Sequence, residues 1–176
     1  LFRSDDAKIV AQRGKVADVD RASEYFDISN STITATFAAK NIMKNRPELH
    51  WLNYENILRR IRSPITTGGI RQVGRFLLVD KAHDLYQKIK STIQSTLDGT
   101  SGELYIHICS GISGGTGGGI FLDVCYLVRE ALSEIGKSEA AVNGYFFLPD
   151  VNLSVPEIAN EPLGSSWMKV NGYAAL

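Results

Sequence analysis

The sequence predicts an α/β fold of the doubly wound class, in which helices cover both faces of a mostly parallel sheet. Two segments, 104–109 and 142–148, are nearly continuous in apolar, β-branched and aromatic residues, which is typical of strands buried on both faces. Between them, residues 120–135 carry apolar side chains at helical spacing, and Gly136 ends that pattern. A strand, a helix and a second strand in this order predict a right-handed βαβ unit.

Further helices are predicted before this unit. Residues 34–43 and 53–62 are helix candidates that end near Pro47 and Pro64, because the residue before a proline avoids helical geometry. Residues 70–97 follow a polar loop and keep apolar side chains at helical spacing, so we expect one long amphipathic helix there.

The bulk composition is that of an ordinary globular protein, and it excludes several classes of function. Of the 176 residues, 44% are hydrophobic and 22% are charged, and the formal net charge is zero. Without a basic excess, there is no electrostatic argument for nucleic acid or an anionic membrane as a partner. No apolar run approaches the roughly 18 residues of a membrane span, and no signal peptide opens the sequence, so we expect a cytoplasmic protein.

The cysteines and the strand histidine have simple structural interpretations. Cys109 and Cys125 make neither a disulfide framework nor a metal site, so we expect two reduced core residues. His107 has apolar neighbours within the first strand, and we expect it to be buried in the core as well.

A glycine-rich loop joins the first strand of the βαβ unit to its helix. Six of the nine residues from Gly111 to Gly119 are glycine. Glycine lets successive backbone N–H groups converge on an anion, and the helix expected to begin near Gly118 adds its own N–H groups and its positive dipole end. The hydroxyl groups of Ser113 and Thr116 can donate to phosphate oxygens. The pattern therefore predicts a phosphate site at the carboxyl end of the strand.

The spacing of this loop separates it from two common phosphate loops. A Walker A loop needs lysine after its last glycine, whereas Gly119 is followed by Ile120. The dinucleotide fingerprint G-x-G-x-x-G also fails, because its third glycine falls on Ile120 or Leu122. A turn that is merely flexible or tightly packed stays open as a structural alternative.

The residues Gly114 to Gly119, between a hydrophobic strand and a helix, resemble the signature loop of the tubulin and bacterial division-GTPase superfamily. The combination with Phe121-Leu122-Asp123 looks closest to the tubulin-like proteins of bacteria. Two positions depart from the usual pattern: Ser113 stands where a glycine is common, and Gly118 stands where a hydroxyl is common.

The resemblance implies a GTP or GDP site with Mg²⁺, built from three groups of residues. The implied phosphate ligands are Gly111, Ser113, Gly114, Gly115, Thr116, Gly117 and Gly118, with Thr67, Gly68 and Gly69 as the γ-phosphate loop. The implied ribose and base contacts are Pro149, Asp150, Glu157, Asn171 and Tyr173. Asp5 and Asp6 are the implied acids near the metal ion.

By the same resemblance, we expect residues 1–176 to form one tubulin-like nucleotide-binding domain that is incomplete at both ends. The first strand with its glycine loop would precede residue 1, and the loop that completes a neighbouring subunit's active site would follow residue 176. The implied function is guanine-nucleotide binding with GTP-dependent, head-to-tail self-assembly into filaments. GTP hydrolysis is expected only when the full chain is assembled, and no catalytic residue is assigned.

Two other functions remain open. A degenerate scaffold would keep the fold and bind partners without nucleotide. A Rossmann-type enzyme would bind NAD with Asp150 on the ribose, although Asp150 lies further downstream of the loop than is usual for that fold.

Overall fold

The computed structural model describes residues 2–3, 22–30, 46–53, 55–57, 69–99, 101–154 and 164–176. The helices and strands assigned within them are, in chain order, β1 (Phe2–Arg3), β2 (Phe26–Asp27), the 3₁₀ helix η1 (Pro47–Leu49), α5 (Arg71–Asp80), α6 (Ala82–Asp98), β3 (Tyr105–Gly111), α7 (Gly115–Glu134), β4 (Ala141–Phe147), α8 (Pro149–Leu153) and α10 (Gly164–Tyr173). The predicted helix at 34–43 lies outside the described residues.

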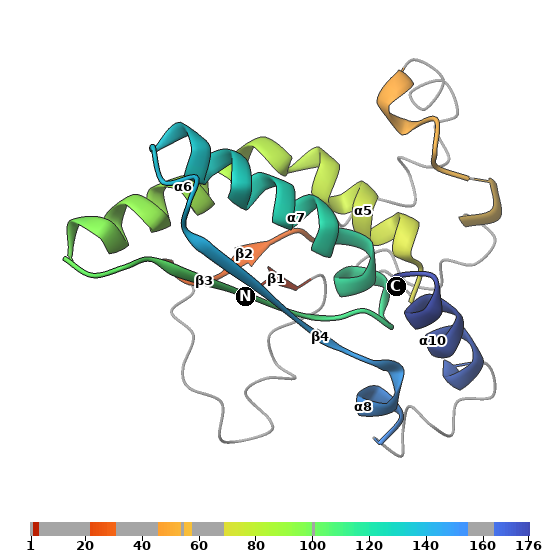
Figure 1. The fold of residues 1–176 in the computed structure, drawn as a ribbon. Helices are drawn as coiled ribbons and strands as arrows, with labels where there is room; N and C mark the ends of the chain where they lie inside the picture. The colour runs from red at the N-terminus through yellow and green to blue at the C-terminus, as the bar shows by residue number, and fades with distance from the viewer. Residues whose placement is uncertain are drawn as a thin grey trace.

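The βαβ unit is present, and its two strands are parallel. β3 and β4 pair from Tyr105 opposite Ala141 to Gly111 opposite Phe147, and α7 connects them. Helices α5, α6 and α7 lie together on one side of this pair (Figure 1). β1 and β2 form a second parallel pair. The α/β class is therefore confirmed, while the two-stranded sheets of the described residues do not establish a doubly wound arrangement.

The prediction that both strands are buried on two faces is wrong. Side chains on β3 alternate between half-buried and exposed, with Tyr105 57% exposed, and most of β4 is exposed, including Tyr145 at 50%. The cause is that the helices of the described residues cover one face only, where Phe121 of α7 meets Phe146 of β4 at a ring distance of 5.0 Å.

The uncovered face also corrects the expectations for two single residues. His107 lies exposed on this face, beside the ring of Tyr145, and Cys109 is an exposed free thiol, so neither is a core residue. Cys125 on α7 is a half-buried free thiol, and this burial raises its pKa.

The long helix predicted over 70–97 is two helices. α5 and α6 meet at Lys81, whose backbone leaves the helical region with φ −117° and ψ 12°. The ammonium group of Lys81 donates to the carbonyl oxygens of Asp27, at 2.7 Å, and Ser29, at 3.0 Å. The break therefore lets α5 and α6 take different directions and ties their junction to the end of β2.

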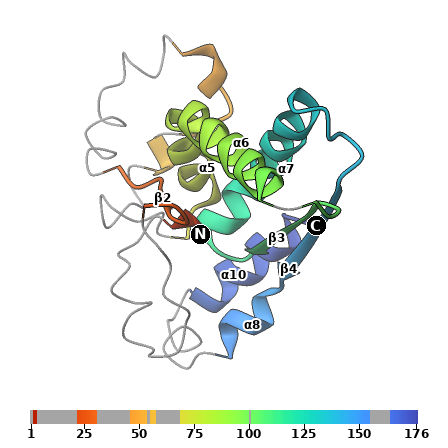
Figure 2. The same ribbon diagram turned by 90° about the vertical axis from the view of Figure 1, so that its left-hand side faces the viewer.

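The hydrophobic core lies where the three long helices meet the sheet. It is filled by fully buried side chains from α5, α6 and α7, among them Phe76, Leu78, Leu85 and Leu132. Figure 2 shows α7 beside the successive helices α5 and α6, and α7 packs against both of them. Within the part of the chain that the structure describes, no helix is long and apolar enough to cross a membrane.

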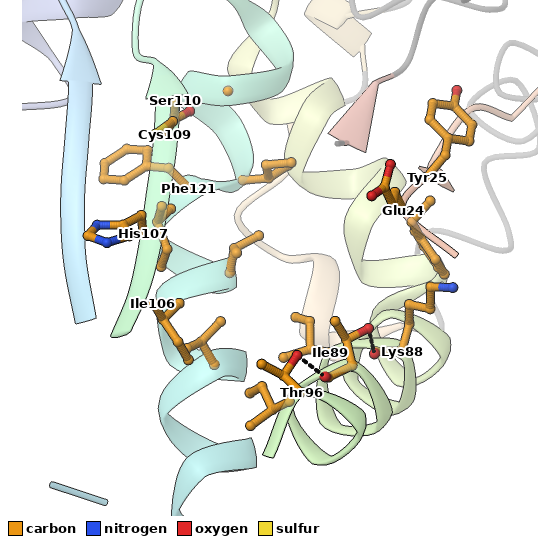
Figure 3. Close-up of a pocket in the computed structure, with 18 of the residues that line it drawn as sticks. Glu24, Tyr25, Lys88, Ile89, Thr96, Ile106, His107, Cys109, Ser110 and Phe121 are labelled. Carbon is orange, nitrogen blue, oxygen red and sulfur yellow. Dashed lines mark hydrogen bonds between the residues drawn. The ribbon is translucent and has the colours of Figure 1, made fainter. Parts of the chain in front are cut away.

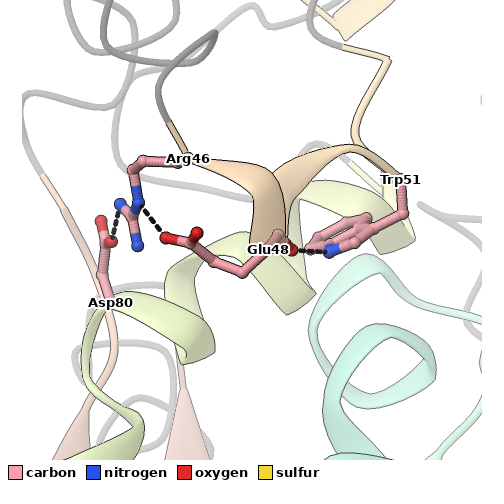
Figure 4. A network of polar contacts seen from close by, with 4 residues as sticks. All are labelled: Arg46, Glu48, Trp51 and Asp80. Atoms are coloured by element: carbon pink, nitrogen blue, oxygen red, sulfur yellow. Dashed lines mark hydrogen bonds and ion pairs between the residues drawn. The ribbon is translucent and has the colours of Figure 1, made fainter.

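A polar network holds η1 against the C-terminal end of α5 (Figure 4). The guanidinium group of Arg46 donates to Glu48 at 2.6 Å and to Asp80 at 2.8 Å. These bonds raise the pKa of Arg46 and lower the pKa of Glu48. The indole N–H of Trp51 donates to the carbonyl oxygen of Glu48. The guanidinium carbon of Arg75 lies over the Trp51 ring, 4.9 Å from the ring centre.

An apolar groove of about 970 Å³ runs along β3, between α6, α7 and residues 23–26 (Figure 3). Among the described residues, β3 pairs with β4 alone. The groove reaches Gly111, Thr116 and Gly117, so one of its ends opens beside the glycine loop.

Candidate functional site

The loop between β3 and α7 is shorter than the sequence predicts. Only residues 112–114 lie between Gly111, which ends β3, and Gly115, which begins α7. The predicted helix start near Gly118 is therefore three residues too late. Gly114 is the N-cap residue with an extended backbone, at φ −85° and ψ 169°, and its carbonyl oxygen accepts the bond from Gly118 N–H at 3.2 Å.

Close packing explains why several glycines continue as helix. A Cβ atom on Gly117 would lie 2.3 Å from the carbonyl oxygen of Gly111, and one on Gly118 would lie 2.4 Å from that of Ile112. A Cβ atom on Gly119 would lie 2.3 Å from the carbonyl oxygen of Arg71 on α5. These three glycines let α7 approach α5 and the end of β3 more closely than any side chain would permit.

The same close approach is seen from the other helix. A Cβ atom on Gly74 of α5 would lie 2.1 Å from the carbonyl oxygen of Gly115. We call the contact formed by Gly74, Gly115 and Gly117–Gly119 the glycine seam. The predicted roles of Gly117 and Gly118 in phosphate binding stay predictions, since packing alone is enough to require glycine at both positions.

Two glycines of the loop have no such packing requirement. A Cβ atom on Gly111 or Gly114 would meet nothing within 4 Å. Gly111 ends β3 and Gly114 is the N-cap of α7, where helical geometry directs the N–H groups of Gly115 and Gly117 out of the helix. This open end of the helix is suited to an anion, because N–H donors and the positive dipole end meet there.

Ser113 precedes the N-cap and is fully buried. Its hydroxyl oxygen has no hydrogen-bond partner among the described residues. A buried hydroxyl without a partner is unfavourable by roughly 1–3 kcal/mol, so this group favours a ligand or solvent partner beside the loop. The phosphate role of Ser113 stays a prediction, as does that of Thr116, which follows in the first turn of α7.

A second helix begins beside this loop. Gly69 has φ +74°, a left-handed conformation that favours glycine, and α5 starts two residues later at Arg71. The Nε of Arg71 donates to the carbonyl oxygen of Gly118 at 2.9 Å, so a cation joins the starts of the two helices. Sequence analysis did not single out Arg71, although a basic residue two positions after a polar loop was a usable signal.

Asn171 of α10 links the two helix starts. Its amide nitrogen donates to the carbonyl oxygen of Gly69 at 2.8 Å and to that of Ser113 at 2.9 Å. The structure thus brings Gly69, Ser113 and Asn171 together. Both donors of the Asn171 amide are used inside the protein.

The remaining predicted residues lie at different distances from this point. Pro149 and Asp150 open α8, directly after β4, and a Cβ atom on Gly172 would lie 2.4 Å from Cγ of Pro149. Tyr173 is 79% exposed at the end of α10. The other assigned positions, Asp5, Asp6, Thr67, Gly68 and Glu157, lie outside the described residues.

The described residues supply binding groups and no metal cluster. Within the described ranges, no group of three or more His, Cys, Asp or Glu residues is arranged to hold a metal ion. What the loop region does contain is two helix N-termini, the cation of Arg71 and a buried hydroxyl. This set of groups can bind an anion, and it includes no general acid or base.

A comparison with protein families identifies the family to which this chain belongs. A family model described as tubulin like matches residues 4–176. The chain belongs to the tubulin-like family. No curated protein and no solved structure matched it. In this tubulin-like chain, the glycine loop follows a β-strand and opens a long helix, as the resemblance of residues 114–119 led us to expect.

Proposed function

We propose that this tubulin-like chain binds guanine nucleotide, with the phosphate groups at the start of α7. The observation that carries the proposal is the pair of open glycines, Gly111 and Gly114, beside the buried hydroxyl of Ser113. The positive ends of α7 and α5 and the charge of Arg71 support an anionic ligand at the same place.

In the proposed complex, the inner phosphates meet the loop around Ser113 to Thr116, and the γ-phosphate meets the segment that ends at Gly69. Pro149 and Asp150 lie at the same carboxyl edge of the strands, since the N–H group of Ile112 donates to the carbonyl oxygen of Phe147 at 3.2 Å. Glu157 completes the ribose contacts, and Tyr173 meets the base. Mg²⁺ accompanies the phosphates, with Asp5 and Asp6 nearby.

The wider proposal follows from family membership. The doubly wound sheet of the full domain would present this site to the next subunit in a head-to-tail filament, because a heterologous contact need not close. Hydrolysis would then be completed by groups of the neighbouring subunit. Catalysis of this kind is positional and electrostatic, with phosphoryl charge held by amide groups and Mg²⁺.

Thermal unfolding of the full-length protein with GTP, GDP, ATP or NAD, each with Mg²⁺, tests the binding proposal. A ligand at a hundred times its dissociation constant stabilises the folded state by about 2.7 kcal/mol. We expect stabilisation by GTP and GDP alone, and a reduced effect in Thr116→Ala. Thr96→Ala on α6 is the matched control, because its hydroxyl donates to the carbonyl oxygen of Thr92 away from the loop.

Each other outcome favours a different function. Stabilisation by NAD instead of GTP would support the Rossmann-type alternative. No stabilisation by any of the four ligands would support the nucleotide-free scaffold. Sedimentation of the full-length protein tests the filament proposal separately, and assembly that does not depend on nucleotide would contradict it.

A further inference from the structure

Asn171 makes the two contacts that join the start of α5 to the start of α7. Its partners lie 102 and 58 residues away in the sequence, at Gly69 and Ser113. Both partners are carbonyl oxygens, so only the nitrogen of the amide group can face them. An amide nitrogen carries two hydrogens, and these two bonds use both of them.

The backbone around Gly69 is shaped for this contact. Gly69 has φ +74°, and its missing side chain is not explained by crowding, because a Cβ atom there would meet nothing within 4 Å. The glycine therefore serves the left-handed backbone, which directs the carbonyl group that Asn171 binds. The residue after this carbonyl, Ile70, caps α5.

The position of Asn171 itself is fixed by its neighbour. Gly172 is buried, and a Cβ atom on it would lie 2.4 Å from Cγ and 2.8 Å from Cδ of Pro149. This close contact seats α10 on the first residue of α8. The amide group of Asn171 is therefore held by a packed helix, and it connects the loops after β3 and β4 to the segment before α5.

We propose that Asn171 is a positioning residue that sets the spacing between the inner-phosphate loop at Ser113 and the γ-phosphate segment at Gly69. This role differs from the base contact that the sequence suggested for Asn171, and it rests on the nucleotide binding proposed above. In the proposed complex, a nucleoside triphosphate would touch both segments, whereas a diphosphate would touch only the loop at Ser113. Fixing the distance between them therefore strengthens triphosphate binding more than diphosphate binding.

The test is Asn171→Asp in the full-length protein. The substitution keeps the shape and places a carboxylate oxygen against two carbonyl oxygens, so the two loops separate. We expect GTP affinity to fall by about tenfold or more, equivalent to ~1.4 kcal/mol, and GDP affinity to fall by clearly less. The preference for GTP over ITP, which lacks the 2-amino group of guanine, should not change.

Two further variants separate positioning from misfolding. Asn171→Ala removes both donors without adding charge. It should likewise lower GTP affinity more than GDP affinity, so that the ratio of the two affinities falls. Asn143→Asp makes the identical chemical change on the exposed face of β4 and should bind both nucleotides as the wild type does. A general loss of structure would lower both affinities equally, so an unchanged ratio with lower affinities contradicts the proposal.

The remaining outcomes are also decisive. Loss of discrimination between GTP and ITP, with an unchanged GTP-to-GDP ratio, would make Asn171 a base contact. If the wild type binds no guanine nucleotide, the proposed function fails, and hydrogen exchange then tests the positioning role by itself. The first hydrogen-bonded amides of the two helices, those of Val73, Gly74 and Gly118, should exchange faster in Asn171→Ala than in the wild type, and equal rates would overturn the role.

Discussion

The two halves of the glycine-rich run differ in what their missing side chains do. In the first half, Gly111 and Gly114 face space that no neighbouring atom fills within 4 Å. In the second half, Gly117 and Gly119 approach backbone carbonyl oxygens so closely that a Cβ atom would lie 2.3 Å from them. The same glycine-rich run thus contains an open half, where we propose that the ligand binds, and a half that is closely packed between backbones.

A loop that binds phosphate, as we propose for this one, needs support as well as donors. The N–H groups at the start of α7 can hold an anion only if the helix start is fixed relative to β3 and α5. The glycine seam fixes it by direct backbone contact, without side chains that could adopt other rotamers. The open half and the packed half are therefore expected to respond differently to substitution.

The largest effect is expected in the glycine seam. Gly74→Ala and Gly117→Ala each force a Cβ atom against a backbone oxygen that has no rotamer to change, so we expect a loss of about 2–4 kcal/mol in the free energy of unfolding. Denaturant unfolding without nucleotide measures it. Gly102→Ala, where a Cβ atom meets nothing within 4 Å, is the control. Seam variants as stable as this control would mean that the close packing is not required.

A smaller effect on stability, but a clear one on binding, is expected at Gly114. Serine is a favourable N-cap residue, and the φ of −85° suits it, so Gly114→Ser should change the unfolding free energy by less than about 1 kcal/mol. Its side chain would fill the open space and compete for the N–H groups of the first turn. Guanine-nucleotide affinity, measured by titration calorimetry, should fall by about tenfold. Unchanged affinity would place the phosphate elsewhere.

A smaller effect again is expected at the ion pair beside the seam. Arg75 of α5 binds Asp123 of α7 through two bonds of 2.9 and 3.0 Å, and its side chain is 45% exposed. Arg75→Lys keeps the charge but loses the paired geometry and the stacking on Trp51. We expect a loss of about 0.5–1 kcal/mol in chemical unfolding. A loss as large as that in Gly74→Ala would mean that this pair, and not the glycines, holds the two helices together.

The smallest effect is expected at Lys90 and Glu134, which join α6 to α7. The ammonium group of Lys90 lowers the pKa of Glu134. A carboxyl group whose pKa is lowered by folding stabilises the protein above its unfolded-state pKa and loses this contribution as the pH falls through its folded-state pKa.

In Glu134→Gln, the unfolding free energy should therefore be slightly below that of the wild type at pH 7. The two curves should converge as the pH falls through the folded-state pKa of Glu134, which lies below the ordinary glutamate pKa of about 4.3. Nucleotide binding should be unaffected in this variant. A constant difference between the curves at every pH would mean that the pair contributes through packing alone.

Local sequence patterns were enough to predict the βαβ unit and its glycine loop. Both strands lie within two residues of their predicted ends, and Gly136, at φ +71°, follows the end of α7 as the pattern indicates. The helix start at Gly115 could not be predicted, because glycine has a low helix propensity and only contacts with α5 make the helical form favourable there. The break at Lys81 was hidden by apolar spacing that continues across it.

Other features depend on partners that are distant in the sequence. An apolar strand such as β4 does not reveal whether one or two of its faces will be covered, since this depends on the other elements of the fold. From the sequence, Asn171 could be predicted to make a polar contact. Its two partners could not be predicted, because Gly69 and Ser113 lie 102 and 58 residues away. Likewise, the sequence alone did not indicate that Arg71 would reach Gly118.

The long separations joined by Asn171 also bear on the order of events during folding. Contacts between distant residues form late, because closing a long loop costs entropy before the contact compensates for it. On the ribosome, at about 5–20 residues per second, roughly 3–12 s pass between the synthesis of Ser113 and that of Asn171, 58 residues later. In the later part of this interval, after α7 has been synthesised as far as Glu134, α5 and α7 can pack through their glycines while the two loops remain unjoined. The nascent chain would thus acquire its helical core before it acquires a preference for the triphosphate.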